Sequence, residues 1–189
     1  VVEFYGEETA ELAERAYALE AAVKDAGYAY DVVHCASPAE IANVWDVRKA
    51  GLGLLLSQRG DAKPLAFVDD ASVPIENLSA YAGDVEAMLA EKGIQASFFA
   101  HASAGCLHIN PMVNPKTVEG LATRREISEA VMALAMKYDG TTTGEHGEGF
   151  ARSIYNEQLY GERLHTAFRQ VKGIFDERNT MNPGKIIDA

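Results

Sequence analysis

Two short, glycine-containing stretches of this 189-residue chain concentrate its histidines and several acidic residues. The first runs from His101 to His108 as His-Ala-Ser-Ala-Gly-Cys-Leu-His, and the second runs from Gly144 to Gly149 as Gly-Glu-His-Gly-Glu-Gly. They hold three of the five histidines in the chain. Neutral imidazoles together with a carboxylate suit a divalent metal such as zinc, cobalt or manganese. The sequence therefore predicts a metal site built from these two stretches.

The second stretch adds a candidate proton acceptor. A histidine left over beside a metal-binding carboxylate can act as a base, because histidine exchanges its proton near neutral pH. The glycines around His146 let a ligand come close, but glycines and charges also suit an ordinary exposed turn. Spacing alone leaves open whether Glu145 or Glu148 is the ligand.

Strands and helices are expected to alternate, with short connections between them. Ser37, Pro38 and Glu40 supply a helix N-cap, a first-turn proline and a capping-box glutamate. Gly27 is expected to end a helix, and Pro111 a strand. The expected strands are 1–6, 28–35, 65–73, 95–100 and 106–110, and the expected helices are 7–26, 38–57, 74–93, 117–138 and 156–178.

This order of elements predicts an α+β fold. We expect a ferredoxin-like α/β sandwich, in which helices pack on one face of a mostly antiparallel sheet. His101 and His108 would then lie on the two strands of one hairpin, so that both imidazoles could face the same point. A single domain over residues 1–189 is expected, and the strand-like start at Val1 suggests excision from a longer chain.

Composition excludes several classes of function. The formal net charge of −11 disfavours binding to nucleic acid or to an anionic membrane surface. No apolar run approaches the roughly 20 residues that a membrane span needs. Cys35 and Cys106 are the two cysteines and lie far apart, so they cannot build an iron–sulfur cluster and they fit a reducing compartment. We expect a cytoplasmic location, with peripheral contact to the inner membrane only through an electron acceptor.

Three further features have both a structural and a functional interpretation. Arg48 follows Trp45 by one helical turn and is either a solvated side chain or a guanidinium that clamps a substrate carboxylate. Asp69 and Asp70 are either solvated charges at a strand edge or a pair for acid–base chemistry. The turn at residues 182–185 ends the last helix by local rules.

At this point the motifs resemble the C-terminal domain of FAD-linked oxidases, the family of D-lactate dehydrogenase, the glycolate oxidase flavin subunit and D-2-hydroxyglutarate dehydrogenase. The resemblance covers essentially the whole chain, and it rests on Trp45-x-x-Arg48, Val73-Pro74, His101-x6-His108-x-Asn110, Gly144-Glu145-His146-Gly147-x-Gly149 and Asn182-Pro183-Gly184-Lys185. Residues 103–106, which precede Leu107, differ from the Gly-Asp-Gly-Asn that the family usually has there. In this respect the chain is similar to a large bacterial branch of the family, in which an iron–sulfur region is fused to the oxidase. That region and the FAD-binding domain have no counterpart in this chain.

The resemblance implies oxidation of a D-2-hydroxy acid by hydride transfer to FAD. It implies a divalent metal, zinc in our assignment, held by His101, His108 and Glu145, and His146 as the base. It further implies that Arg48 and Asn110 bind the substrate and that Asn182 approaches the flavin.

The partners implied are the 2-hydroxy acid and the FAD-binding domain of the same parent chain. Without that domain the isolated fragment should be inactive, and its exposed face could drive homo-oligomer formation. The alternative is a stand-alone metal-binding or metallohydrolase module, in which the same ligands activate water.

Overall fold

The computed structural model describes residues 1–189, apart from the side chain of Leu52. The chain forms two compact units, Val1–Leu54 and Leu55–Ala189. Among the described residues, no helix combines the length and the apolar character that a membrane span requires.

The first unit contains α1 (Thr9–Asp25) and most of α2 (Pro38–Leu56). The capping box is confirmed, because Ser37 N–H donates to Glu40 Oε2 over 2.9 Å and Glu40 N–H donates to Ser37 Oγ over 3.3 Å. Gly27 is also confirmed as the helix stop, since its φ of 71° is left-handed and its N–H donates to Lys24 O.

The strands expected at 1–6 and 28–35 are wrong. Both segments lack regular secondary structure. A strand needs a hydrogen-bonded neighbour as well as apolar residues, and the described strand pairs leave these two segments out.

The second unit contains a four-stranded antiparallel sheet centred on β4 (Cys106–Val113). β3 (Ala96–His101) pairs along one side of β4. The short strands β1 (Lys63–Pro64) and β2 (Ala71–Ser72) pair with β4 in turn. The predicted strand 65–73 is therefore largely wrong, because the chain leaves the sheet after Leu65 and returns at Ala71.

β4 continues past Pro111, against the expectation that this residue would end it. Met112 N–H donates to Gln95 O, so the Pro111 nitrogen faces away from β3. On that other side Leu65 N–H donates to Pro111 O, just where the chain turns away after β1. The missing N–H of Pro111 therefore falls at a gap between short strands, where a proline is tolerated.

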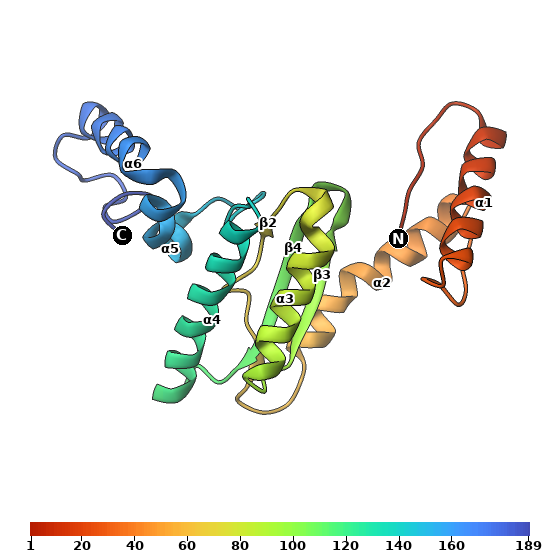
Figure 1. Ribbon diagram of the computed structural model, residues 1–189, viewed down its shortest axis with the longest axis horizontal. Helices are drawn as coiled ribbons and strands as arrows, with labels where there is room; N and C mark the ends of the chain where they lie inside the picture. Colours follow the sequence, from red (N-terminus) through yellow and green to blue (C-terminus); the bar gives the residue numbers. More distant parts are fainter. The chain divides into compact units, whose positions relative to one another are not determined.

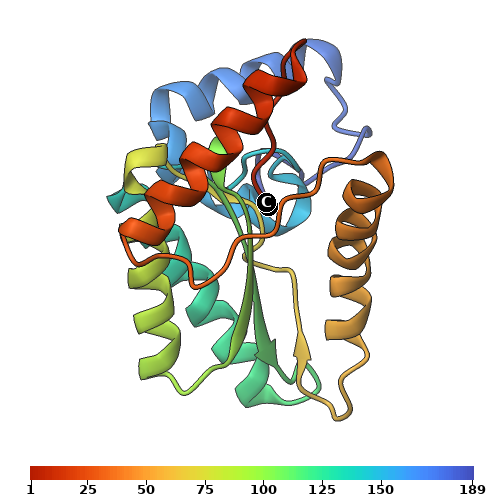
Figure 2. The same cartoon turned by 90° about the vertical axis from the view of Figure 1, so that its right-hand side faces the viewer.

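Helices α3 (Leu78–Glu91) and α4 (Val118–Lys137) lie on the same side of β3 and β4 (Figures 1 and 2). A 3₁₀ turn, η1 (Ile75–Asn77), leads into α3. Alternation along β4 sends Leu107, Ile109 and Val113 into the buried apolar core and Cys106, His108 and Asn110 to the opposite face. The buried core residues of the two helices are Tyr81, Val85, Leu89, Ile127, Val131 and Ala135.

The chain ends in α5 (Gly149–Arg152), the 3₁₀ turn η3 (Ser153–Tyr155) and α6 (Asn156–Phe175). The C-terminal tail is fixed to them, because Asn156 Nδ2 donates to Ile186 O and Ile186 N–H donates to Ser153 Oγ, both over 2.9 Å. Helices with a small antiparallel sheet confirm the predicted α+β class.

Candidate metal centre and active site

A tight hairpin brings His101 and His108 together. β3 ends at His101, a 3₁₀ turn η2 (Ala102–Ala104) follows, and Gly105 adopts a left-handed φ of 66° before β4 begins. His101 is paired with Cys106 and His108 with Phe99, so both imidazoles project from the same face of the hairpin. Their ring centroids lie 5.0 Å apart.

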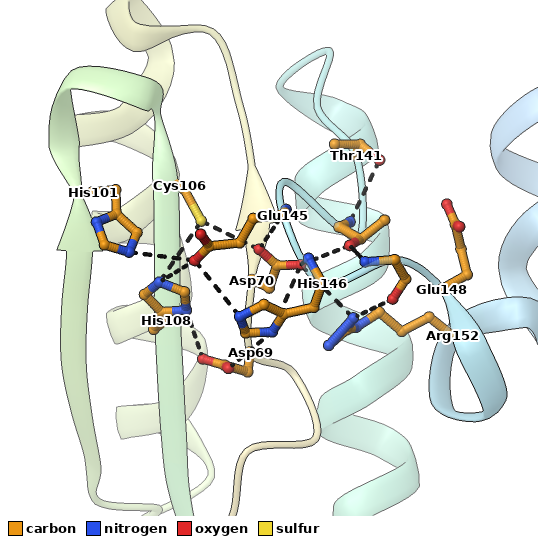
Figure 3. Close-up of polar contacts among 12 residues, drawn as sticks. Asp69, Asp70, His101, Cys106, His108, Thr141, Glu145, His146, Glu148 and Arg152 are labelled. Atoms are coloured by element: carbon orange, nitrogen blue, oxygen red, sulfur yellow. Dashed lines mark hydrogen bonds and ion pairs between the residues drawn. The ribbon is translucent and has the colours of Figure 1, made fainter. Parts of the chain in front are cut away.

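The second contributor is the segment after α4, which is attached to β2 by two backbone hydrogen bonds. Thr141 N–H donates to Ser72 O over 2.8 Å, and Ser72 N–H donates to Thr141 O over 3.0 Å. A few residues later the turn carries Glu145 and His146 toward the hairpin face (Figure 3). Two stretches that are far apart in sequence therefore meet at one point.

Glu145 lies between the two hairpin histidines. Its Oε1 is 3.3 Å from His101 Nε2 and 3.3 Å from His108 Nε2. Two donors at about 2.05 Å from a tetrahedral ion lie about 3.3 Å apart. The donor atoms of these three residues could thus hold one divalent ion, and their imidazole and carboxylate chemistry suits zinc.

Asp69 orients His108. Its Oδ1 lies 2.9 Å from His108 Nδ1, and the side chain of His108 is 10% exposed. A carboxylate on Nδ1 favours the tautomer in which Nδ1 carries the proton, which leaves the Nε2 lone pair directed at Glu145 and its neighbours.

His146 is the fourth residue of the cluster, and its donor atoms could also join Asp69 and His108, or Asp70 and Glu145, around an ion. Its Nε2 is 3.6 Å from Glu145 Oε1, and its Nδ1 is 3.6 Å from Asp69 Oδ2. Its ring stacks on that of His108 at 5.7 Å. With a side chain that is 46% exposed, His146 is accessible to a ligand at the cluster, as a base must be.

Asp70 lies behind the turn and is fully buried. Burial by itself raises the pKa of this carboxyl, but the hydrogen bonds from Thr143 Oγ1, the backbone of His146 and Glu145, and the Cys106 thiol together lower it. Asp70 is therefore a carboxylate at neutral pH. Burial is also the main reason that the pKa of the Cys106 thiol is raised.

The remaining predicted residues belong to different parts of the chain. Asn110 is buried on β4, two residues from His108 on the same face. Arg48 belongs to α2 in the first unit. Asn182 lies in the turn after α6, and the described contacts do not join it to the cluster. Glu148 accepts a hydrogen bond from Tyr160 over 2.6 Å, which favours Glu145 as the ligand.

Sequence reasoning left Asp69 and Asp70 as either solvated charges at a strand edge or a pair for acid–base chemistry, and it missed that Asp69 contacts His108 and that Asp70 binds the turn. One signal was available, because two adjacent carboxylates interrupt the apolar run from Leu65 to Val73, and charged residues are rarely buried unless they are paired. Arg152 and Thr143, which contact Asp70, gave no such signal.

Comparison with known proteins identifies the family of this chain. The sequence profile of the family described as "FAD linked oxidases, C-terminal domain" matches residues 1–186. The chain belongs to this family. The match runs through both compact units.

Relatives within the family include D-2-hydroxyglutarate dehydrogenases from Escherichia coli and Pseudomonas putida. Each is 37% identical over 98% of this chain, which corresponds to 19% and 18% of the respective relative. A mitochondrial D-lactate dehydrogenase [cytochrome] from Arabidopsis thaliana is 26% identical over 83% of this chain and 27% of its own length. The chain thus spans about a fifth of the length of the first two relatives.

Proposed function

We propose that this chain supplies the substrate side of a flavin-dependent dehydrogenase that oxidises a D-2-hydroxy acid. The family match and the names of the relatives, which specify D-2-hydroxyglutarate and D-lactate, support this substrate class. The observation that carries the proposal is the position of Glu145 Oε1, 3.3 Å from two imidazole nitrogens with His146 beside it.

The residues that would hold the metal are His101, His108 and Glu145. A divalent metal bound there would act as a Lewis acid toward the hydroxyl and carboxylate oxygens of the substrate. FAD, held by a domain outside this chain, would supply the hydride acceptor.

His146 would take the hydroxyl proton on Nε2. Its Nδ1 lies 3.6 Å from Asp69 Oδ2 and 3.9 Å from Asp70 Oδ2, so two carboxylates stabilise the imidazolium that forms. As the proton reaches His146, the C2 hydrogen leaves with its electron pair, and the substrate becomes a 2-oxo acid.

The charge of the cluster explains why a metal would be needed for binding as well as for chemistry. Asp69, Asp70 and Glu145 place three carboxylates together, and Arg152, 3.8 Å from Asp70 Oδ2, is the cation among their described contacts. An anionic hydroxy acid would be repelled by this set. A divalent metal, with Arg48 on the substrate carboxylate, would reverse that repulsion.

Two asparagines would contribute to binding. Asn110 would donate a hydrogen bond to the substrate, and Asn182 would approach the flavin at the domain that holds it. The partners would be the 2-hydroxy acid and that FAD-binding domain, and self-association would make the protein a homo-oligomer.

The test is anaerobic bleaching of the flavin in the full-length parent. We expect D-2-hydroxyglutarate or D-lactate to bleach it, and dipicolinate to abolish the bleaching until zinc is added back. The fragment 1–189 alone should reduce no dye. Bleaching that persists after the bound metal has been removed would contradict the metal's role.

A metallohydrolase remains the alternative, because two histidines and a glutamate also form the ligand set of hydrolytic zinc sites. Ester or amide hydrolysis by the zinc-loaded fragment, without any flavin, would favour it over the dehydrogenase.

A further inference from the structure

Asp70 has an unusual backbone as well as an unusual environment. Its φ is 80°, in the left-handed region that favours glycine, and its side chain has no exposed surface. A non-glycine residue in this conformation persists only where the surrounding structure compensates for the strain. At Asp70 the compensation comes from hydrogen bonds to the neighbouring turn.

Consecutive backbone N–H groups of that turn converge on Asp70. Gly144 N–H donates to the Asp70 backbone oxygen over 2.8 Å. Glu145 N–H donates to Oδ1 over 3.0 Å, and His146 N–H donates to Oδ2 over 2.9 Å. The backbone N–H groups of the proposed metal ligand, Glu145, and of the proposed base, His146, thus both donate to the carboxylate of Asp70 (Figure 3).

Two side chains close the arrangement. Thr143 Oγ1 donates to Asp70 Oδ2 over 2.6 Å and accepts from Gly147 N–H over 2.7 Å. Arg152, whose side chain is 12% exposed, donates from Nη1 to Gly147 O over 2.9 Å and lies 3.8 Å from Asp70 Oδ2. Arg152 therefore supplies the positive charge that a buried carboxylate requires.

We propose that Asp70, with Arg152 as its counterion, is a positioning residue that fixes Glu145 and His146 relative to His101 and His108. This inference rests on the proposed function for the roles of those residues. Asp70 acts through the turn and does not bind the metal itself. Its two oxygens already accept from Thr143, Glu145, His146 and the Cys106 thiol.

The test compares Asp70→Asn with Asp84→Asn in the full-length protein. The Asp70→Asn substitution keeps the shape of the side chain but replaces one acceptor oxygen with a donor that meets another donor. Asp84 is the matched control, because its carboxylate accepts from Lys137 and Tyr138 at the α3–α4 contact. Two quantities are measured in each variant: amide hydrogen exchange of residues 143–149 by mass spectrometry, and the Kd for Zn²⁺.

In Asp70→Asn we expect amide exchange in residues 143–149 to accelerate about tenfold or more, while β3 and β4 keep their protection. The Kd for Zn²⁺ should rise about 10–100-fold, the effect of losing an outer-shell partner. Asp84→Asn should leave both quantities unchanged. If Asp70→Asn does not fold, Thr143→Val, which removes one donor to Asp70, takes its place. It should accelerate the exchange and raise the Kd for Zn²⁺ by smaller factors than those expected for Asp70→Asn.

Three outcomes would overturn the inference. Unchanged exchange in residues 143–149 would show that Asp70 does not hold the turn. Weaker zinc binding with unchanged exchange would make Asp70 a ligand instead. Equal acceleration in β3 and β4 would make its role purely structural. Exchange also separates the two proposals, because it responds to Asp70 even if the protein binds no zinc or oxidises no hydroxy acid.

Discussion

His101 and His108 stand on paired strands, whereas Glu145 and His146 stand on a turn; we call these the strand half and the loop half of the site. In the strand half, each histidine has a cross-strand partner, Cys106 or Phe99, within a continuous ladder. In the loop half, the backbone N–H groups of both residues are held by the side chain of Asp70.

The difference separates two ways of building precise geometry. A β-hairpin fixes side chains through many repeated backbone bonds, so the loss of one contact is shared by its neighbours. In a turn held by one buried carboxylate, the ordered conformation depends on that single residue. The order of the loop half should therefore depend on Asp70 more than the order of the strand half depends on any one of its ladder hydrogen bonds.

The largest expected effect is on catalysis, and it tests whether the two halves have different chemical roles. His146→Ala should lower kcat/KM for the hydroxy acid about 10²–10⁴-fold while the bound zinc remains. His101→Ala should lose both zinc and activity. Metal analysis alongside flavin reduction checks this, and loss of zinc from His146→Ala would show that the base is also a ligand.

The second prediction compares a glycine from each half. Gly105 lies in the hairpin turn of the strand half, and Gly147 lies in the turn of the loop half. A Cβ at Gly105 would lie 1.9 Å from Val73 O, and its φ is also left-handed. We expect Gly105→Ala to lower the free energy of unfolding by about 3 kcal/mol or more. Gly147 has a φ of 79° but open space around its Cβ, so Gly147→Ala should cost about 1–2 kcal/mol. Urea denaturation measures both, and equal losses would contradict the distinction.

The orientation of His108 gives a prediction of intermediate size. Asp69→Asn replaces the carboxylate that lies 2.9 Å from His108 Nδ1. The Kd for Zn²⁺ should rise about 10–100-fold, because outer-shell partners set ligand basicity. Asp61→Asn, which affects an exposed pair with Lys116, is the control. Titration with a competing chelator measures both, and a Kd that stays at the wild-type value would rule out this role of Asp69.

The smallest effect concerns the core beneath the strand half. Tyr81 is fully buried, its Oη has no hydrogen-bond partner among the described residues, and burial raises its pKa. Tyr81→Phe should leave the free energy of unfolding unchanged or raise it by up to about 1 kcal/mol. Tyr138→Phe loses a 2.7 Å bond to Asp84 and should cost about 1 kcal/mol. A clear loss of stability in Tyr81→Phe would reveal a partner for its hydroxyl.

Most helices were predictable because their signals are local. The capping box at Ser37 and Glu40 was read from neighbouring residues and is present, and the helix expected at 117–138 is observed as Val118–Lys137. Strands were less predictable, because a strand depends on a partner that the sequence does not name. Segments 1–6 and 28–35 have strand-like composition but no ladder, and within 65–73 only Ala71 and Ser72 form a ladder with β4.

The candidate site was predictable to the extent that it depends on residue type. The set His101, His108, Glu145 and His146 was chosen from the sequence, and the described structure brings these four together. Spacing alone did not predict which glutamate joins the histidines, because Glu145 and Glu148 differ only in the direction that the turn gives them; the family resemblance implied Glu145.

By itself, the sequence determined the donor types, most helices and the hairpin that pairs two histidines, because each follows from residues close together in the chain. Only the tertiary structure decided that Asp69 and Asp70 belong to the site, since the groups that donate hydrogen bonds to their side chains lie 36 to 76 residues away. The physical reason is burial: a carboxylate that would be solvated in an isolated strand becomes, once water is excluded, a group that must be paired and that orders whatever pairs with it.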